Sequence, residues 1–232
     1  MKLTSHEIAK MIDLSGVQAF VGENEIRALA RLARKYKCGL VTVLPSQTPF
    51  AIELLKEAPA IRTSGNVGFP SGGSTTNSKV FEAKELISLG CAELDMVLNI
   101  GLLLSEDYQN VLNDIKAVVD VSHDIPVKVI LECHYLSDDL IRKGCELCLE
   151  AGAAFIKTGT GWAPTGATNH NIALIKSVVG NEIGIKASGG IRSLKTMIEL
   201  YRLGATRFGI GLSGAVPILE ELYALPGDTV EI

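Results

Sequence analysis

The chain has 232 residues, a formal net charge of −4 and an apolar fraction of 47%. These values fit one or two folded domains and exclude a disordered chain. The small negative charge gives no general attraction to nucleic acid or to anionic membranes, and no apolar run approaches the roughly 20 residues that span a bilayer. The first residues lack the apolar core of a signal peptide, and five cysteines are an odd number for a disulfide framework. We therefore expect a cytoplasmic protein without nucleic-acid or membrane partners.

Eight short apolar runs alternate with amphipathic stretches along the chain. Runs rich in Val, Ile and Leu without polar alternation are typical of parallel strands buried on both faces. The predicted strands are Met11–Ser15, Gly39–Leu44, Ile61–Gly68, Glu93–Asn99, Val127–Glu132, Phe155–Thr158, Gly184–Ala187 and Arg207–Ile210. Three of the helices between them end at a glycine just before a strand: Gly90, Gly152 and Gly204. The pattern predicts an α/β protein in which residues 1–232 form a single (β/α)8 TIM barrel, with an open doubly wound sheet as the alternative.

Three ionisable residues stand inside these apolar runs: Asp95, Lys157 and Lys186. The outer face of a barrel strand packs on helices and is apolar, so these side chains should point inward, near the C-terminal mouth. A second cation and partial desolvation both lower the pKa of a lysine, whose free amine can then attack a carbonyl and form a Schiff base. The carboxylate can hold or relay protons. The alternative is a structural ion-pair cluster, and we favour catalysis because two lysines occupy adjacent strands, each followed by a glycine-containing turn.

Further polar and glycine-rich positions surround this trio. Lys128 and Glu132 lie four apart on one strand and so share a face. They could pair with each other or extend the charged interior, and we expect a supporting structural role. Glycine-rich turns follow the last two strands and lead into helices, the first of which Ser193 could cap. Backbone N–H groups at such helix starts bind phosphate, and barrels often place a phosphate there. The residues concerned are Gly189, Gly190, Arg192, Gly209, Gly211 and Ser213.

From Met11 to Ala215 the sequence resembles the deoxyribose-phosphate aldolases, a family of class I aldolases. Four stretches carry the resemblance: Gly68–Pro70 with Thr75–Lys84, Glu93–Gly101, Phe155–Gly161 and Gly184–Arg192. The resemblance implies reversible cleavage of 2-deoxyribose 5-phosphate to acetaldehyde and glyceraldehyde 3-phosphate, in carbohydrate catabolism, with no metal and no other cofactor. A homodimer or a homotetramer would be compatible with it.

The resemblance also implies roles for individual residues. Lys157 matches the Schiff-base lysine, Lys186 the second lysine that depresses its pKa, and Asp95 the proton-relay residue. Positions matching the substrate pocket are Asp13, Ser15 (where the family usually has Thr), Thr160, Gly161, Gly189, Gly190, Arg192, Gly209, Gly211 and Ser213.

The sequence also departs from the family pattern. Gly159 replaces a serine of the Lys-Thr-Ser-Thr-Gly motif, and the bulky Trp162 follows that motif as either a lid or a loop anchor. Gly211 and Leu212 stand where the family carries hydroxyl residues, and the chain does not end in the tyrosine that many members have. These departures leave open a related Schiff-base aldolase that acts on a different or unphosphorylated sugar or aldehyde acceptor. From other classes, a barrel that binds a sugar phosphate without catalysis and a barrel isomerase remain alternatives.

Other reactive side chains receive ordinary interpretations. Cys145 and Cys148 lie on one predicted helix without a second pair, so they do not form a zinc site. The remaining cysteines read as small apolar filler. His134 follows the fifth predicted strand, where a site role is possible.

Overall fold

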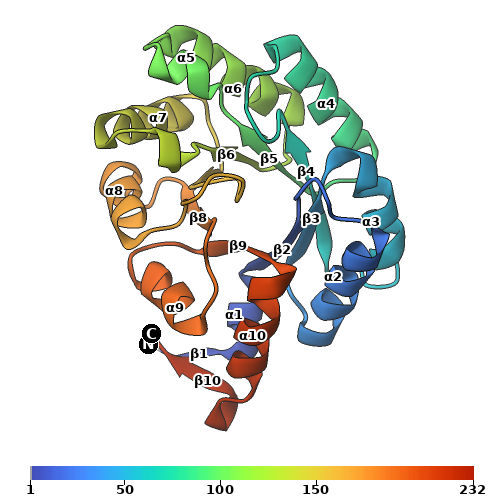
Figure 1. Cartoon of the computed structure of the whole chain (residues 1–232). Helices are drawn as coiled ribbons and strands as arrows, with labels where there is room; N and C mark the ends of the chain where they lie inside the picture. The colour runs from blue at the N-terminus through green and yellow to red at the C-terminus, as the bar shows by residue number, and fades with distance from the viewer. Residues whose placement is uncertain (1) are drawn as a thin grey trace.

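The computed structural model describes residues 2–232, and its central feature is a closed barrel of eight parallel strands (Figure 1). The strands follow one another around the barrel in chain order, and the last pairs with the first. They are β2 (Ile12–Gly16), β3 (Leu40–Val43), β4 (Arg62–Val67), β5 (Glu93–Val97), β6 (Val127–Ile130), β7 (Phe155–Lys157), β8 (Gly184–Ser188) and β9 (Arg207–Gly211). Each overlaps one of the eight predicted strands, so the expected (β/α)8 barrel is confirmed.

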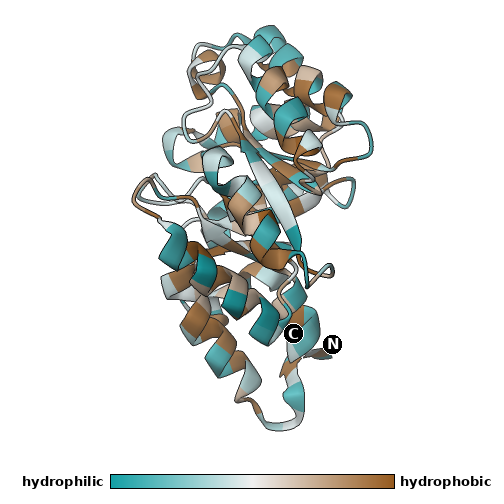
Figure 2. Ribbon diagram, turned by 90° about the vertical axis from the view of Figure 1, so that its right-hand side faces the viewer, coloured by the Kyte–Doolittle hydropathy of each residue, from teal (hydrophilic) through white to brown (hydrophobic). Residues whose placement is uncertain are grey.

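Helices surround the barrel and cover the outer face of its strands (Figure 1). Hydrophobic and hydrophilic residues alternate along them (Figure 2), as expected of helices that pack one face on a sheet. In α2, for example, Ile26, Leu29 and Ala33 are fully buried. The helices are α1 (Ser5–Lys10), α2 (Glu23–Tyr36), α3 (Thr48–Leu55), α4 (Thr76–Ser88), α5 (Ile100–Leu104), α6 (Tyr108–Ser122), α7 (Asp138–Glu150), α8 (Asn169–Val179), α9 (Leu194–Arg202) and α10 (Leu212–Tyr223). None of the helices in residues 2–232 is long and apolar enough to cross a membrane.

Helix ends are formed by residues that favour capping and tight turns. Ser193 caps α9 as predicted, since its side chain accepts a hydrogen bond from the backbone N–H of Thr196 at 3.1 Å. Gly90, Gly152 and Gly204 adopt φ values of 100°, 79° and 116° after their helices. This left-handed region favours glycine, so the chain can turn directly into the next strand.

The two ends of the chain form a feature that the sequence analysis did not predict. The short strands β1 (Lys2–Thr4) and β10 (Thr229–Glu231) pair antiparallel, with Leu3 opposite Val230. This small sheet lies beside α1 and α10, apart from the barrel (Figure 1). It fixes both ends of the chain at one place on the surface.

Candidate active site

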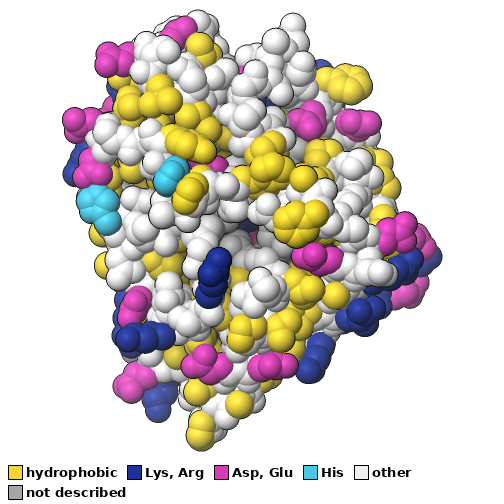
Figure 3. Space-filling view, in the orientation of Figure 1, with side chains coloured by type: hydrophobic (Ala, Val, Ile, Leu, Met, Phe, Trp, Pro, Cys, Tyr) yellow, Lys and Arg dark blue, Asp and Glu magenta, His cyan; other side chains and the backbone are white. Residues whose placement is uncertain are grey.

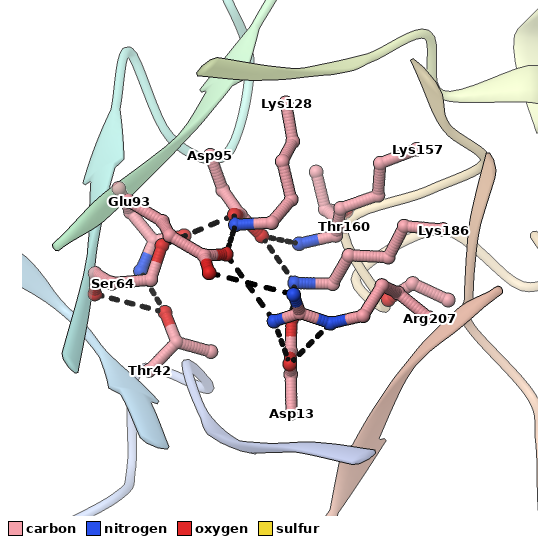
Figure 4. Close-up of polar contacts among 12 residues, drawn as sticks. Asp13, Thr42, Ser64, Glu93, Asp95, Lys128, Lys157, Thr160, Lys186 and Arg207 are labelled. Atoms are coloured by element: carbon pink, nitrogen blue, oxygen red, sulfur yellow. Dashed lines mark hydrogen bonds and ion pairs between the residues drawn. The ribbon is translucent and has the colours of Figure 1, made fainter. Parts of the chain in front are cut away.

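The three charged residues predicted to point inward meet at the barrel axis (Figure 4). The Nζ atoms of Lys157 and Lys186 lie 2.8 and 2.7 Å from the same carboxylate oxygen, Oδ2 of Asp95. Lys157 on β7 and Lys186 on β8 are register partners, which explains why their amines converge. All three residues are almost completely buried. The structure therefore brings the three predicted residues into contact.

A layer of further ion pairs lies around and beneath the trio (Figure 4). Lys128 on β6 contacts Glu93 at 2.5 Å and Asp95 at 2.9 Å. Arg207, at the start of β9, contacts Asp13 at 2.5 Å and Glu93 at 3.2 Å. Because burial of an unpaired charge is costly, this mutual pairing is what permits so many charged groups inside the barrel.

The opposite side of the interior is polar but uncharged. Ser64 on β4 donates a hydrogen bond to Oδ1 of Asp95 at 3.1 Å. Asn66 donates to the Thr42 hydroxyl at 2.9 Å and to the carbonyl of Val43 at 2.7 Å. The Ser64 bond fixes one side of Asp95, whose other contacts are ammonium groups.

Lys157 and Lys186 experience opposite electrostatic environments. Burial and the charge of Lys186 together lower the pKa of Lys157 to about 8, against the opposing effect of Asp95. Burial also disfavours the charged form of Lys186, but Asp13 and Asp95 outweigh it and raise the pKa of that amine. Lys157 is thus the amine with a substantial free-base fraction near neutral pH.

Asp95 stays ionised at any ordinary pH. Burial alone would raise its pKa, but the ammonium groups of Lys128, Lys157 and Lys186 hold that pKa well below its usual range. A carboxylate in this setting is a fixed anion that positions the amines, and a poor store for a proton.

A cavity of about 500 Å³ opens above the amines at the carboxyl ends of the strands. Figure 3 looks onto this face, where hydrophobic side chains surround the hollow. Nine of the predicted pocket residues line the cavity: Ser15, Thr160, Gly161, Gly189, Gly190, Arg192, Gly209, Gly211 and Ser213. The volume suits a small sugar derivative.

Asp13, the tenth predicted pocket residue, does not line this cavity. It is fully buried below, where Oδ2 lies 2.6 Å from Nζ of Lys186. The sequence placed Asp13 on the correct strand, but its carboxylate faces the ion-pair layer, so it contacts Lys186 in place of a substrate. Gly209 provides the space for this arrangement, since a Cβ there would lie 2.8 Å from Oγ of Ser188 and 3.3 Å from Cε of Lys186.

Trp162 is placed as a loop anchor. Its indole N–H donates to the carbonyl of Val17 at 2.9 Å, and its ring packs edge-on against Phe69 at a centroid distance of 6.2 Å. Gln18 adds a second tie, from Nε2 to the carbonyl of Gly161 at 3.0 Å. The loop after β7 is therefore fastened to the loop after β2.

His134 and the cysteines lie outside the site. His134 is exposed and shares a hydrogen bond of 2.8 Å between Nδ1 and the Thr165 hydroxyl. All five cysteines are buried, and none is among the described residues that line the cavity. Burial raises the pKa of Cys38, Cys91 and Cys145 to about 12 and also raises that of the other two thiols well above its usual value.

Several functional candidates escaped the sequence analysis. Glu93 and Arg207 begin their strands, where charged residues are common, yet Glu93 stands two residues before Asp95 and so shares its face. Gln18 in the loop after β2 and Glu25 in α2 also line the cavity, and no sequence motif identifies them. Lys128 pairs with Glu93 and Asp95, so the contact with Glu132 considered above does not form.

Comparisons with known proteins agree with this site. Residues 6–214 match the DeoC/LacD family aldolase. The chain is 45% identical to the deoxyribose-phosphate aldolase of Klebsiella pneumoniae, over 97% of this chain and 92% of that one. It is 42% identical to that of Thermococcus kodakarensis, over 94% and 98%.

Solved structures give the same result. QR15, an aldolase, is 37% identical, superposes with a TM-score of 0.87 and covers 93% of this chain and 96% of its own. The tetrameric deoxyribose phosphate aldolase of Aeropyrum pernix is 28% identical, with a TM-score of 0.86 over 95% and 93%. The buried lysine pair, the barrel and the matches over nearly the whole chain together show that this protein belongs to the DeoC/LacD aldolase family.

Proposed function

We propose that this protein is a class I aldolase that reversibly cleaves 2-deoxyribose 5-phosphate to acetaldehyde and glyceraldehyde 3-phosphate. The observation that carries the proposal is Lys157, a buried amine with a pKa of about 8 that precedes Thr160 and Gly161, two residues of the lining of a sugar-sized cavity. Relatives of the same length that bear the name deoxyribose-phosphate aldolase support the choice of substrate. The protein acts as a soluble cytoplasmic enzyme, and a homo-oligomer is part of the proposal because one relative is tetrameric.

In this reaction Lys157 adds to the C1 aldehyde, and loss of water gives an iminium ion. The positive nitrogen withdraws electrons from the C2–C3 bond as the C3 hydroxyl loses its proton. That bond breaks, glyceraldehyde 3-phosphate leaves, and an enamine of acetaldehyde remains on Lys157. Protonation at C2 and addition of water then release acetaldehyde and restore the amine.

Lys186 and Asp95 prepare Lys157 for this chemistry. Lys186 keeps its proton because it contacts both Asp13 and Asp95, so its charge is always present beside Lys157. Asp95 holds the two amines at 2.8 and 2.7 Å, which fixes the direction of attack. These contacts support assigning both residues to the catalytic centre with Lys157.

The phosphate of the substrate would bind at the ends of β8 and β9. There the backbone of Gly189, Gly190 and Gly211 lines the cavity beside the exposed Arg192. Leu212 contributes no hydroxyl, and the acidic residue Glu25 lines the same cavity. This mixed lining supports a weaker preference for phosphorylated substrates than a hydroxyl-rich loop would give.

Borohydride trapping with acetaldehyde tests the proposal. The adduct should reduce to a stable ethyl group on Lys157, located by peptide mass spectrometry, and Lys157→Ala should lose both the label and aldolase activity, by roughly 10⁴-fold or more. Lys79→Ala is the matched control, because that lysine is also fully buried but pairs with Asp114 outside the cavity. Labelling that persists in Lys157→Ala, or a wild type without label, would contradict the proposal.

A further inference from the structure

Glu132 is a buried carboxyl group that the scheme above does not use. It follows β6, is 2% exposed and adopts a positive φ of 56°. Its oxygens accept hydrogen bonds from the backbone N–H of Thr160 at 3.2 and 3.3 Å, and Oε2 also accepts one from the Thr160 hydroxyl. Since Thr160 lines the cavity, a single hydroxyl group separates Glu132 from the space where the substrate binds.

The sequence leaves room for this carboxyl group. A Cβ at position 159 would lie 2.8 Å from Oε1 of Glu132, so a side chain there would displace the carboxylate. Gly159 is the position where this chain lacks the serine of the family motif. With glycine in place of the family serine, no side chain at position 159 overlaps the Glu132 carboxylate.

Glu132 and Asp95 both interact electrostatically with Lys157, but their pKa values are shifted in opposite directions. Burial raises the pKa of Glu132 against the hydrogen bonds from Thr160 and the charges of Lys157 on β7 and His134 beside it. Asp95, in contrast, is held ionised by three ammonium groups. Two carboxyl groups whose pKa values are displaced in opposite directions divide the roles of acid and fixed anion between them.

Counting charges links Glu132 to Lys157. Among the buried side chains of the ion-pair layer four basic groups face three carboxylates: Lys128, Lys157, Lys186 and Arg207 against Asp13, Glu93 and Asp95. Arg62 also contacts Glu93, but its side chain is 47% exposed, so water screens its charge and it is not counted among the buried groups. Glu132 makes the numbers equal. The interior is then neutral both when Lys157 and Glu132 are charged and when a proton has moved so that both are uncharged.

We infer that Glu132 stores the proton that Lys157 gives up and returns it, through the hydroxyl of Thr160, to the oxygen that leaves as the Schiff base forms. Thr160 contacts the leaving oxygen, and Glu132 is a positioning residue that acts through Thr160. This inference rests on the proposed function of Lys157.

The step conserves atoms and charge. The neutral amine and the aldehyde first form a carbinolamine, with a new C–N bond and a hydroxyl on the former carbonyl carbon. Thr160 donates its hydrogen to that hydroxyl and receives the proton of Glu132 as the C–O bond breaks. The products are an iminium ion, a water molecule and a Glu132 carboxylate, so the interior remains neutral.

Rapid-quench trapping measures this step directly. The enzyme is mixed with acetaldehyde, quenched with borohydride at increasing times, and the adduct on Lys157 is counted by mass spectrometry. Glu132→Gln keeps a hydrogen-bond acceptor for Thr160 but cannot store a proton. It should slow adduct formation by roughly 100- to 1,000-fold. Thr160→Val should slow it to a similar extent, and Thr160→Ser should restore the rate to within about tenfold of the wild type.

The pH profile and the double variant separate proton storage from simple support of the loop. In the wild type, adduct formation should fall as the pH rises through the raised pKa of Glu132, whereas Glu132→Gln should rise with the free amine and then stay level. Glu132→Gln combined with Thr160→Val should be no slower than the slower single variant, because both interrupt one path.

Glu82→Gln is the matched control. Glu82 is half-buried, burial raises its pKa, and it accepts a hydrogen bond from the backbone N–H of Gly68 at 2.7 Å, away from Lys157. Its substitution should leave the trapping rate within about twofold, far below the effect of losing a proton-transfer group. A wild-type rate and pH profile in Glu132→Gln, or effects that multiply in the double variant, would overturn the inference. Absence of an adduct in the wild type would instead overturn the proposed function.

Discussion

The lysines on neighbouring strands of the barrel interior are the same kind of side chain but differ in how completely they are paired. Lys128 and Lys186 each contact two carboxylates. Within residues 2–232, Lys157 contacts the carboxylate of Asp95 alone. Lys157 and Lys186 are neighbours in register, yet the pKa of Lys157 falls to about 8 and that of Lys186 rises. One additional carboxylate thus separates a structural ammonium group from a nucleophile.

The comparison also shows where stability and reactivity are located. A layer with full pairing tolerates burial of its charges, while an amine with one partner gains from losing its proton. The fully paired ammonium group of Lys186 can therefore supply the charge that keeps Lys157 reactive without itself losing a proton.

Substitution of Lys186 gives the largest expected effect on this contrast. Lys186→Leu removes the permanent cation beside Lys157, so the pKa of Lys157 should rise and less free amine should exist at neutral pH. We expect kcat/KM at pH 7 to fall by roughly 100- to 1,000-fold and its alkaline rise to shift to higher pH. Each carboxylate that Lys186 contacts keeps another basic partner, so circular dichroism should show an intact fold.

Lys128→Leu is the control for that variant. Lys128 lowers the pKa of Lys157 less than Lys186 does, so its pH profile should shift less. An unchanged profile with normal turnover in Lys186→Leu would remove Lys186 from the mechanism.

Substitution of Asp13 tests the ion-pair layer itself. Asp13→Asn leaves Lys186 and Arg207 with one carboxylate fewer, and we expect a loss of about 3 kcal/mol in the free energy of unfolding at pH 7, measured in urea. Lys186 and Arg207 hold the pKa of Asp13 below its usual value despite burial. Its ionised form therefore stabilises the fold above about pH 4, and this contribution is lost as the pH falls through the lowered pKa. Asp13→Asn should accordingly lose less stability on acidification than the wild type, and equal losses would contradict the pairing.

Two substitutions at the phosphate end of the cavity should have smaller effects on kcat/KM, in opposite directions. Arg192→Ala should lower kcat/KM for 2-deoxyribose 5-phosphate by roughly 10- to 100-fold and leave that for 2-deoxyribose unchanged. Glu25→Gln should raise the value for the phosphorylated sugar, by up to about tenfold, because a like charge is removed from the cavity. Steady-state kinetics with both sugars checks this. If the two variants change both substrates equally, neither residue senses the phosphate.

Trp162→Phe should have the smallest effect. It removes the hydrogen bond to the Val17 carbonyl and keeps the packing on Phe69. A neutral hydrogen bond contributes about 1 kcal/mol, so the KM should rise by no more than about fivefold while kcat stays constant. A large fall in kcat would make Trp162 part of the chemistry and not an anchor.

The barrel was predictable because buried parallel strands have apolar sequences, and Asp95, Lys157 and Lys186 were conspicuous within them. The pairing of β1 with β10 was not predictable, since three-residue strands more than 200 positions apart carry no local signal. The ion pairs that these residues form were harder to predict than the residues themselves. The sequence could not tell that Asp13 faces Lys186 below the cavity, or that Lys128 prefers Glu93 to Glu132. Such choices depend on how the strands are staggered around the barrel.

The buried cysteines have a consequence for an enzyme whose product is a reactive aldehyde. Thiolates compete with amines for such electrophiles, and repeated adduct formation at cysteine would gradually inactivate the catalyst. Here every thiol is enclosed, and burial raises the pKa values of all five well above the usual range, so almost no thiolate exists at physiological pH. The protein should therefore keep its activity through long exposure to concentrated acetaldehyde.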